Sequence, residues 1–145
     1  MSKLPENADE MFCFAVYNAS HAINQIYGPL LRPLGLTYPQ YITLMLLWER
    51  DAQGVSELAA QLSLKTSTLT PLLKRLESSG LVQRIRGTKD ERQVFVHLTD
   101  KGRDLHAASR KITSCLVEAT EMEPEALDQI TTNLTRLTKN LTHGS

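Results

Sequence analysis

The sequence predicts a mainly α fold with a small β-wing, built as a winged helix-turn-helix between long terminal helices. Three observations carry this prediction. Apolar residues recur at helical spacing along most of the 145 residues. Two helical patterns are separated by only a brief turn, as in a helix-turn-helix. The pattern then changes to alternation on both sides of a charged turn, which indicates a β-hairpin.

The composition is that of a single folded domain over residues 1–145. Hydrophobic residues make up 41% and charged residues 22%, as in folded soluble proteins. The longest apolar runs are far too short to cross a bilayer, and no secretion signal opens the chain, so we expect a cytoplasmic protein without membrane contact. Two cysteines, 102 residues apart, match neither a disulfide framework nor a metal-binding spacing. We expect no metal and no cofactor.

The first predicted helix begins at Asn7, because Glu10 three residues later completes a pattern resembling a capping box. Its apolar residues continue at helical spacing until Gly28 and Pro29, which bend or end it. A second helix is expected from about Thr37 to about residue 50, followed by a turn over residues 51–54.

Residues 55–64 and 66–80 form the two helices of the predicted helix-turn-helix. Leucines share one face of the second helix, and Gly80 suits the position just after its end. Strands are expected on both sides of the turn GTKDE. Thr99 should cap a further helix that runs to about residue 119, and Pro124 should begin a last one that runs to about residue 141.

The net charge of zero conceals a basic segment. Residues 65–92 hold seven cations and three acids, a net charge of +4, so the rest of the chain carries −4. A local basic surface can hold phosphates while acidic regions elsewhere stay in solvent. Chance clustering on a solvated surface is the alternative interpretation of the charge taken alone.

The polar side of the 66–80 helix has small hydroxyls near its start and cations one turn later, which suits a recognition helix in a major groove. An ordinary amphipathic helix would show the same pattern. The basic hairpin favours DNA binding because its cations can reach phosphates or the minor groove, and Asp90 can orient the Arg92 guanidinium. The candidate DNA-contacting residues are Ser67, Thr68, Thr70, Pro71, Lys74, Arg75, Arg86, Lys89, Asp90 and Arg92.

TLTPLLKRLESSGLV (68–82) followed by DERQVFVHLTDKG (90–102) resembles the MarR family of dimeric bacterial transcription regulators, and the resemblance extends over roughly residues 8–140. It implies a homodimer that represses transcription by binding an inverted-repeat operator in double-stranded DNA. Residues 37–99 would be the DNA-binding region, and residues 8–36 and 100–142 the dimerisation helices.

FCFAVYNASHAINQIYGPLLRPLGLTYPQY (12–41) narrows the resemblance to the organic-hydroperoxide-sensing branch of that family, of the two-cysteine type. The resemblance implies that an organic hydroperoxide oxidises Cys13 at the dimer interface. The Tyr27 and Tyr38 hydroxyls would lie near Cys13 of the other subunit, with Tyr17 lining the same pocket. It also implies that Cys115 of the other subunit resolves the oxidised thiol as a disulfide.

Elementary geometry agrees with a shared site. Fourteen residues of helix rise about 21 Å, so Tyr27 cannot touch Cys13 of its own chain. A thiolate attacks the O–O bond of a peroxide, and phenolic donors can stabilise that thiolate. We expect little help from the helix dipole, because Cys13 lies beyond the first turn of a helix that begins at Asn7.

Three alternatives stay open from the residues alone. Either cysteine can be a packing residue of an apolar helix. A regulator of the same fold could bind a small ligand non-covalently, with Cys13 incidental. A thiol peroxidase is the third, but the sequence lacks a C-x-x-C pair and its basic winged helix would serve no purpose there. We therefore expect a protein that is not an enzyme.

Overall fold

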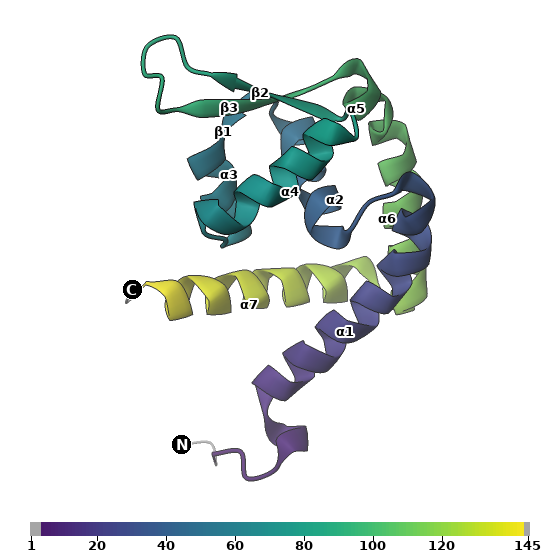
Figure 1. The fold of residues 1–145 in the computed structure, drawn as a ribbon. Coiled ribbons are helices and arrows are strands. Elements are labelled where there is room, and N and C mark those ends of the chain that lie inside the picture. The colour runs from purple at the N-terminus through teal and green to yellow at the C-terminus, as the bar shows by residue number, and fades with distance from the viewer. Residues whose placement is uncertain (1–3, 144–145) are drawn as a thin grey trace.

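The computed structural model describes residues 4–143 and confirms the mainly α fold with a β-wing (Figure 1). The upper part of the view is the winged region. The long helix α7 runs beneath it, and α1 descends from α6 toward the N-terminus. No helix among the described residues is long and apolar enough to span a membrane. The elements in order are η1 (Ala8–Glu10), α1 (Phe12–Leu31), η2 (Arg32–Leu34), α2 (Tyr38–Glu49), β1 (Gln53–Gly54), α3 (Val55–Leu62), α4 (Thr66–Ser78), β2 (Val82–Arg86), β3 (Val94–Leu98), α5 (Asp100–Asp104), α6 (His106–Thr120) and α7 (Pro124–Thr142).

The prediction that the first helix begins at Asn7 is wrong. Asn7 precedes only the single 3₁₀ turn η1, and Glu10 accepts hydrogen bonds from the Asn7 side chain and the Glu6 amide. Met11 is extended, with φ −84° and ψ 120°, so α1 begins at Phe12. At the other end, α1 continues past Gly28 and includes Pro29 before it ends at Leu31.

The second helix begins as predicted. Thr37 caps α2 through a full capping box, in which its hydroxyl accepts from the Gln40 amide and the Gln40 side chain accepts from the Thr37 amide. The turn expected over residues 51–54 is only partly a turn. Gln53 and Gly54 form the strand β1, which pairs antiparallel with Val96 and Phe95 of β3. The sheet therefore has three strands in the order β1-β3-β2.

The helix-turn-helix and its wing follow the sequence prediction closely. Gly80 has φ +77°, and the Leu81 amide returns to the Leu76 carbonyl, which closes α4 with a glycine C-cap. The hairpin then pairs Val82 with Leu98 at one end and Arg86 with Val94 at the other.

The helix predicted between Thr99 and residue 119 is interrupted at Leu105, so α5 and α6 are separate. Thr99 caps α5 as predicted, since its hydroxyl accepts from the Gly102 amide. At the break the indole N–H of Trp48 donates to the Gly102 carbonyl at 2.9 Å. An uninterrupted helix would offer that carbonyl to the amide of His106.

The core lies in the winged region and does not extend along the terminal helices. Leu69, Leu73 and Leu76 of α4 are fully buried against α2, α3 and the sheet. In contrast, α7 has no buried residue and α1 buries only Tyr27 and Leu31. Burial of an apolar face is the usual source of stability for such helices, so the terminal helices lack most of their packing within one chain.

Candidate DNA-binding and thiol sites

The polar face of α4 is exposed to solvent because the leucines on its other face are buried. Leu69, Leu73 and Leu76 anchor the helix, so the positions between them point outward. Thr70 is half-buried and its hydroxyl donates to the Thr66 carbonyl. The other predicted contact residues of α4 are exposed, namely Ser67, Thr68, Pro71, Lys74 and Arg75.

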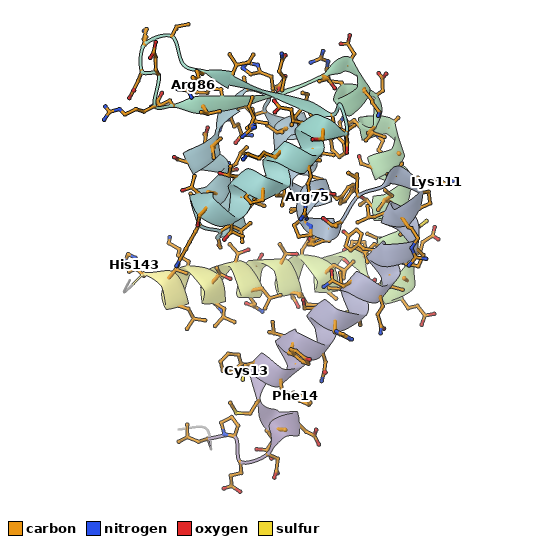
Figure 2. The ribbon with its side chains drawn as sticks, in the orientation of Figure 1. Cys13, Phe14, Arg75, Arg86, Lys111 and His143 are labelled. Carbon is orange, nitrogen blue, oxygen red and sulfur yellow. The ribbon has the colours of Figure 1, made fainter. Side chains whose placement is uncertain are left out.

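The hairpin places its predicted cations on a tight, projecting turn. Arg86, Lys89 and Arg92 are exposed, and Figure 2 shows Arg86 on the hairpin that projects from the body of the protein. The Asp90 carboxylate accepts from both the Arg92 amide, at 3.0 Å, and the Arg92 Nε, at 3.3 Å. This pairing holds the guanidinium while 92% of the Arg92 side chain remains exposed.

A hollow separates the hairpin from the start of α4. Thr66 and Thr70 line it on the helix side, and Arg92 and Gln93 line it on the hairpin side. Arg84, which also lines the hollow, joins β2 to Glu77 of α4, with 3.2 Å between guanidinium and carboxylate oxygen. The Arg84 amide also donates to Glu77 and is the largest cause that lowers the pKa of that carboxyl. Arg84 is thus occupied in fastening the wing to α4, a role that counting charges along the sequence does not reveal.

Cys13 is exposed and lies in the first turn of α1, as the second residue of the helix. The expectation that it lies beyond the first turn is wrong, because extended Met11 delays the start of α1. The first-turn amides lack helical acceptors, and this end of the helix dipole favours an anion. Tyr17 and His21 share a shallow hollow with Cys13, and their rings stack 6.3 Å apart.

The predicted thiol-pocket tyrosines fall into two separate groups. Tyr27 and Tyr38 lie together, with ring centroids 4.8 Å apart, whereas Tyr17 lies beside Cys13. Tyr41 packs against Tyr27 at 5.8 Å and was not among the predicted residues. Its signal is its spacing from Tyr38, three residues along the same helix.

Burial sets the protonation of this tyrosine cluster. Desolvation, followed by the neighbouring Tyr38 and Tyr41, raises the pKa of Tyr27 from 10.0 to about 12. Desolvation also raises the pKa of Tyr38. A phenol is neutral at physiological pH even at its ordinary pKa of 10.0, and burial strengthens that preference.

Cys115 lies half-buried on α6, beside residues that pack into the core. Both cysteines are free thiols. Ile112 is buried and Leu116 packs against the core, so Cys115 sits near the contact between α6 and α1. Cys13, in contrast, lies on the part of α1 that descends below α7 (Figure 2). Within residues 4–143, no group of three or more His, Cys, Asp or Glu side chains could hold a metal ion.

The terminal helices expose continuous apolar faces. In α7, apolar residues recur at alternating spacings of three and four, as in a coiled-coil seam: Leu127, Ile130, Leu134, Leu137 and Leu141. Ile130 is 42% and Leu141 71% exposed. The helix α1 has no Lys, Arg, Asp or Glu from Phe12 to Leu31. A groove runs between Phe12 and Val16 on α1 and Leu134 and Leu137 on α7.

Comparison with known proteins gives a family match over the middle of the chain. Residues 25–108 match the family model described as Transcriptional regulator SarA/Rot. The organic hydroperoxide resistance transcriptional regulator of Bacillus subtilis is 38% identical over 133 residues, which cover 92% of this chain and 90% of that protein. The regulator TtmR of Methylorubrum extorquens is 54% identical over 101 residues, or 70% of this chain. That match spans about half (52%) of the length of TtmR.

Solved structures give the same fold. AbfR of Staphylococcus epidermidis has a TM-score of 0.78 at 37% identity, with 90% of both chains covered. AbfR structures include the reduced protein bound to DNA, the overoxidised protein bound to DNA and a form with a disulfide. A MarR-family regulator from Rhodococcus has a TM-score of 0.83 at 21% identity, covering 92% of this chain and 96% of that chain.

Proposed function

Because this chain belongs to the SarA/Rot family of winged-helix transcriptional regulators, and not to a family of enzymes, we propose that it is a homodimeric repressor that releases its operator when an organic hydroperoxide oxidises Cys13. Residues 37–99 bind DNA in this proposal, and residues 8–36 and 100–142 join the two protomers. The observation that carries it is that Cys13, at the start of α1, lies far along that helix from Tyr27, so a site that contains both side chains needs a second chain.

The exposed face of α4 and the hairpin support DNA binding. Hydroxyls and cations project from α4, and Arg92 is held at the other side of the hollow by Asp90. One α4 helix would enter the major groove of each half-site of an inverted repeat, with the hairpin cations on flanking phosphates or minor grooves. The B. subtilis relative is named as a transcriptional regulator, and AbfR has been solved bound to DNA.

The exposed seam of α7 and the uncharged face of α1 support a dimer. Exposed apolar faces of this extent indicate an interaction site. A second copy is the natural occupant, because an isologous interface buries the same apolar faces of both chains. Antiparallel α1 helices would also bring Cys13 of one protomer to the Tyr27–Tyr38 pair of the other.

The placement of the thiol supports the redox step. Cys13 is exposed in a first helical turn, and the buried Tyr27 phenol remains a donor that can stabilise a thiolate. The Cys13 thiolate would attack the O–O bond, which leaves a sulfenic acid and releases an alkoxide that takes a proton to become the alcohol. The Cys115 thiol of the other subunit would then displace water from the sulfenic acid and form a disulfide.

The disulfide is the form that we propose to release DNA. AbfR has been solved bound to DNA in both its reduced and its overoxidised form, so overoxidation is compatible with DNA binding in that protein. A covalent link between subunits would change the spacing of the two α4 helices. If the disulfide disfavours the DNA-bound arrangement by only a few kcal/mol, the affinity for the operator falls by orders of magnitude.

A titration of operator DNA with and without an alkyl hydroperoxide, followed by thiol reduction, tests this proposal. Wild-type protein should lose affinity on oxidation and regain it with reductant. Cys13→Ser should bind DNA and ignore the peroxide, because a serine hydroxyl is not ionised at neutral pH. Cys115→Ser should accumulate Cys13 sulfenate or its overoxidised forms, without the intersubunit Cys13–Cys115 bond on a non-reducing gel.

Mass spectrometry of the oxidised protein decides between the open alternatives. Unchanged DNA affinity after verified formation of the Cys13–Cys115 disulfide would refute the sensor and favour a regulator that responds to a non-covalent ligand. Full reversibility of Cys115→Ser, with no Cys13–Cys115 peptide in the wild type, would leave Cys115 as a packing residue.

A further inference from the structure

Five aromatic rings from α1, α2 and α6 contact one another in series, and we call this series the ladder. The ladder begins at Tyr38 and Tyr27, whose centroids are 4.8 Å apart, and the next step to Tyr41 is 5.8 Å. Tyr41 then packs edge-on against Trp48 at 6.0 Å, and Trp48 stacks on His106 at 5.1 Å with 16° between the planes. The ladder (Tyr38, Tyr27, Tyr41, Trp48 and His106) thus links α1, α2 and α6 by direct contact.

Trp48 is also hydrogen-bonded to α5, just before the break between α5 and α6. Its indole N–H donates to the Gly102 carbonyl at 2.9 Å, across 54 residues of sequence. This bond takes the carbonyl that a continuous helix would use internally. Trp48 therefore fixes the position of α5, which is only five residues long.

Gly102 in turn lies against the joint between α4 and β2. A Cβ added at Gly102 would lie 2.1 Å from the Leu81 carbonyl oxygen, so the two backbones are in direct contact. The Thr99 amide donates to that same Leu81 carbonyl at 3.0 Å, and the Thr99 hydroxyl donates to the Gly80 carbonyl at 2.6 Å. Residues 80–81 connect the end of α4 to the first strand of the wing.

We propose that Trp48 is a positioning residue that couples the Tyr27–Tyr38 pair to the α4–β2 joint, through its ring contact with Tyr41 and its hydrogen bond to Gly102. A displacement of Tyr27 is passed to Tyr41 and Trp48, because packed rings cannot yield without moving their neighbours. The indole N–H carries the displacement to Gly102, and backbone contact carries it to Leu81. The α4–β2 joint, and with it α4 and the hairpin together, moves relative to α1 as a result.

The coupling itself is measured without any peroxide. Hydrogen exchange of the Gly102 and Thr99 amides is compared in wild type, Tyr27→Leu, Trp48→Phe and the double variant. Tyr27→Leu should speed exchange at both amides by about threefold to tenfold, the range of coupling between contacting side chains. In the Trp48→Phe background, which keeps a ring but removes the donor, Tyr27→Leu should add little.

A second experiment measures the redox response. Only this experiment depends on the proposed function. Trp48→Phe should leave the rate of Cys13 oxidation at its wild-type value, while the loss of DNA affinity on oxidation shrinks by about threefold to tenfold. His106→Gln is the matched control, because His106 is the terminal rung and contributes no bond to Gly102. It should preserve both the amide protection and the redox response.

The two arms separate failure of the coupling from failure of the sensor. If the effects of Tyr27→Leu and Trp48→Phe on amide exchange simply add, the coupling through Trp48 is refuted, whatever the peroxide does. If wild-type DNA affinity ignores Cys13 oxidation, the redox proposal fails and the exchange cycle still decides on Trp48. Because either variant could lower stability, thermal unfolding of each is measured alongside, and amides of α3 serve as the internal reference.

Discussion

Tyr27 shows how one side chain combines a structural and a chemical role. Its ring belongs to the small buried part of α1, and its hydroxyl carries a proton up to a pH of about 12. A phenol that ionised near neutral pH would repel a thiolate, whereas a neutral phenol donates a hydrogen bond to it. Burial therefore suits Tyr27 to stabilise an anion supplied by another element.

The raised pKa of Tyr27 predicts a loss of stability in alkali. The folded chain holds this proton more tightly than the unfolded chain, whose ordinary pKa is 10.0. The corresponding stability is fully present below pH 10 and is lost as the pH rises toward about 12. Tyr27→Phe should therefore show a smaller fall in melting temperature over that interval, measured by circular dichroism. The melting temperature of Tyr17→Phe, whose substituted ring is exposed, should fall as in the wild type. Parallel curves of melting temperature against pH for all three proteins would contradict the prediction.

At the scale of elements, α4 and the hairpin act as one unit. Arg84 and Glu77 fasten β2 to α4, the Gly80 cap sets the angle between them, and Asp90 holds Arg92 at the edge of the hollow. The cations left exposed on this unit point away from the buried leucines. This arrangement assigns Lys74 and Arg92 to phosphate contacts in the proposed complex.

Removal of one of these cations should weaken operator binding without unfolding the protein. Lys74→Ala or Arg92→Ala should lower the slope of log affinity against log salt by roughly one unit for each phosphate that the variant no longer neutralises. Lys111→Ala is the control, since Lys111 is exposed on α6, away from the hairpin that carries Arg86 (Figure 2). A variant with normal thermal stability and an unchanged slope would show that the substituted cation does not bind a phosphate.

Local signals in the sequence predicted the elements that depend on local interactions. The start of a helix near Thr37, the Gly80 cap and the alternation of β3 each depend on residues close together in the sequence, and each is present. The strand β1 leaves none, because Gln53 and Gly54 are extended only through pairing with β3 some 40 residues away. Beside the break at Leu105, the Gly102 carbonyl accepts from Trp48, 54 residues away in the sequence. Extended Met11 interrupts a pattern that otherwise suggested one long helix.

The residues of the candidate site also differ in whether local sequence signals could identify them. Charge and spacing along the chain were sufficient to select the exposed side chains of α4 and the hairpin. Within the ladder, Tyr41 has a local signal in its spacing from Tyr38. The contacts of Trp48 and His106 have none, because they join α2 to α6 across the fold.

At the scale of the whole molecule, the protomer is a packed winged region with two long helices that have little to pack against. The exposed seam of α7 and the groove between α7 and α1 make a stable monomer of this form unfavourable. Stability should therefore rise with protein concentration, as for obligate dimers.

A charge placed in the α7 seam tests this assembly. Leu134→Glu should raise the dimer dissociation constant at least about thirtyfold, the effect of roughly 2 kcal/mol at an interface hot spot. Sedimentation equilibrium measures it, with Thr132→Glu as the control, because Thr132 lies on the opposite side of α7 from the seam. A wild-type protein that is monomeric at micromolar concentration would refute the shared thiol site as well.

The distance between Cys13 and Tyr27 along one helix has a genetic consequence. In the proposed dimer each site takes its thiol from one chain and its phenol from the other. A Cys13→Ser chain paired with a Tyr27→Phe chain would then form one site with both defects and one site with neither. Two alleles that each impair the response would complement one another inside a single heterodimer. Placed together on one chain and paired with wild type, the same two changes would leave both sites damaged.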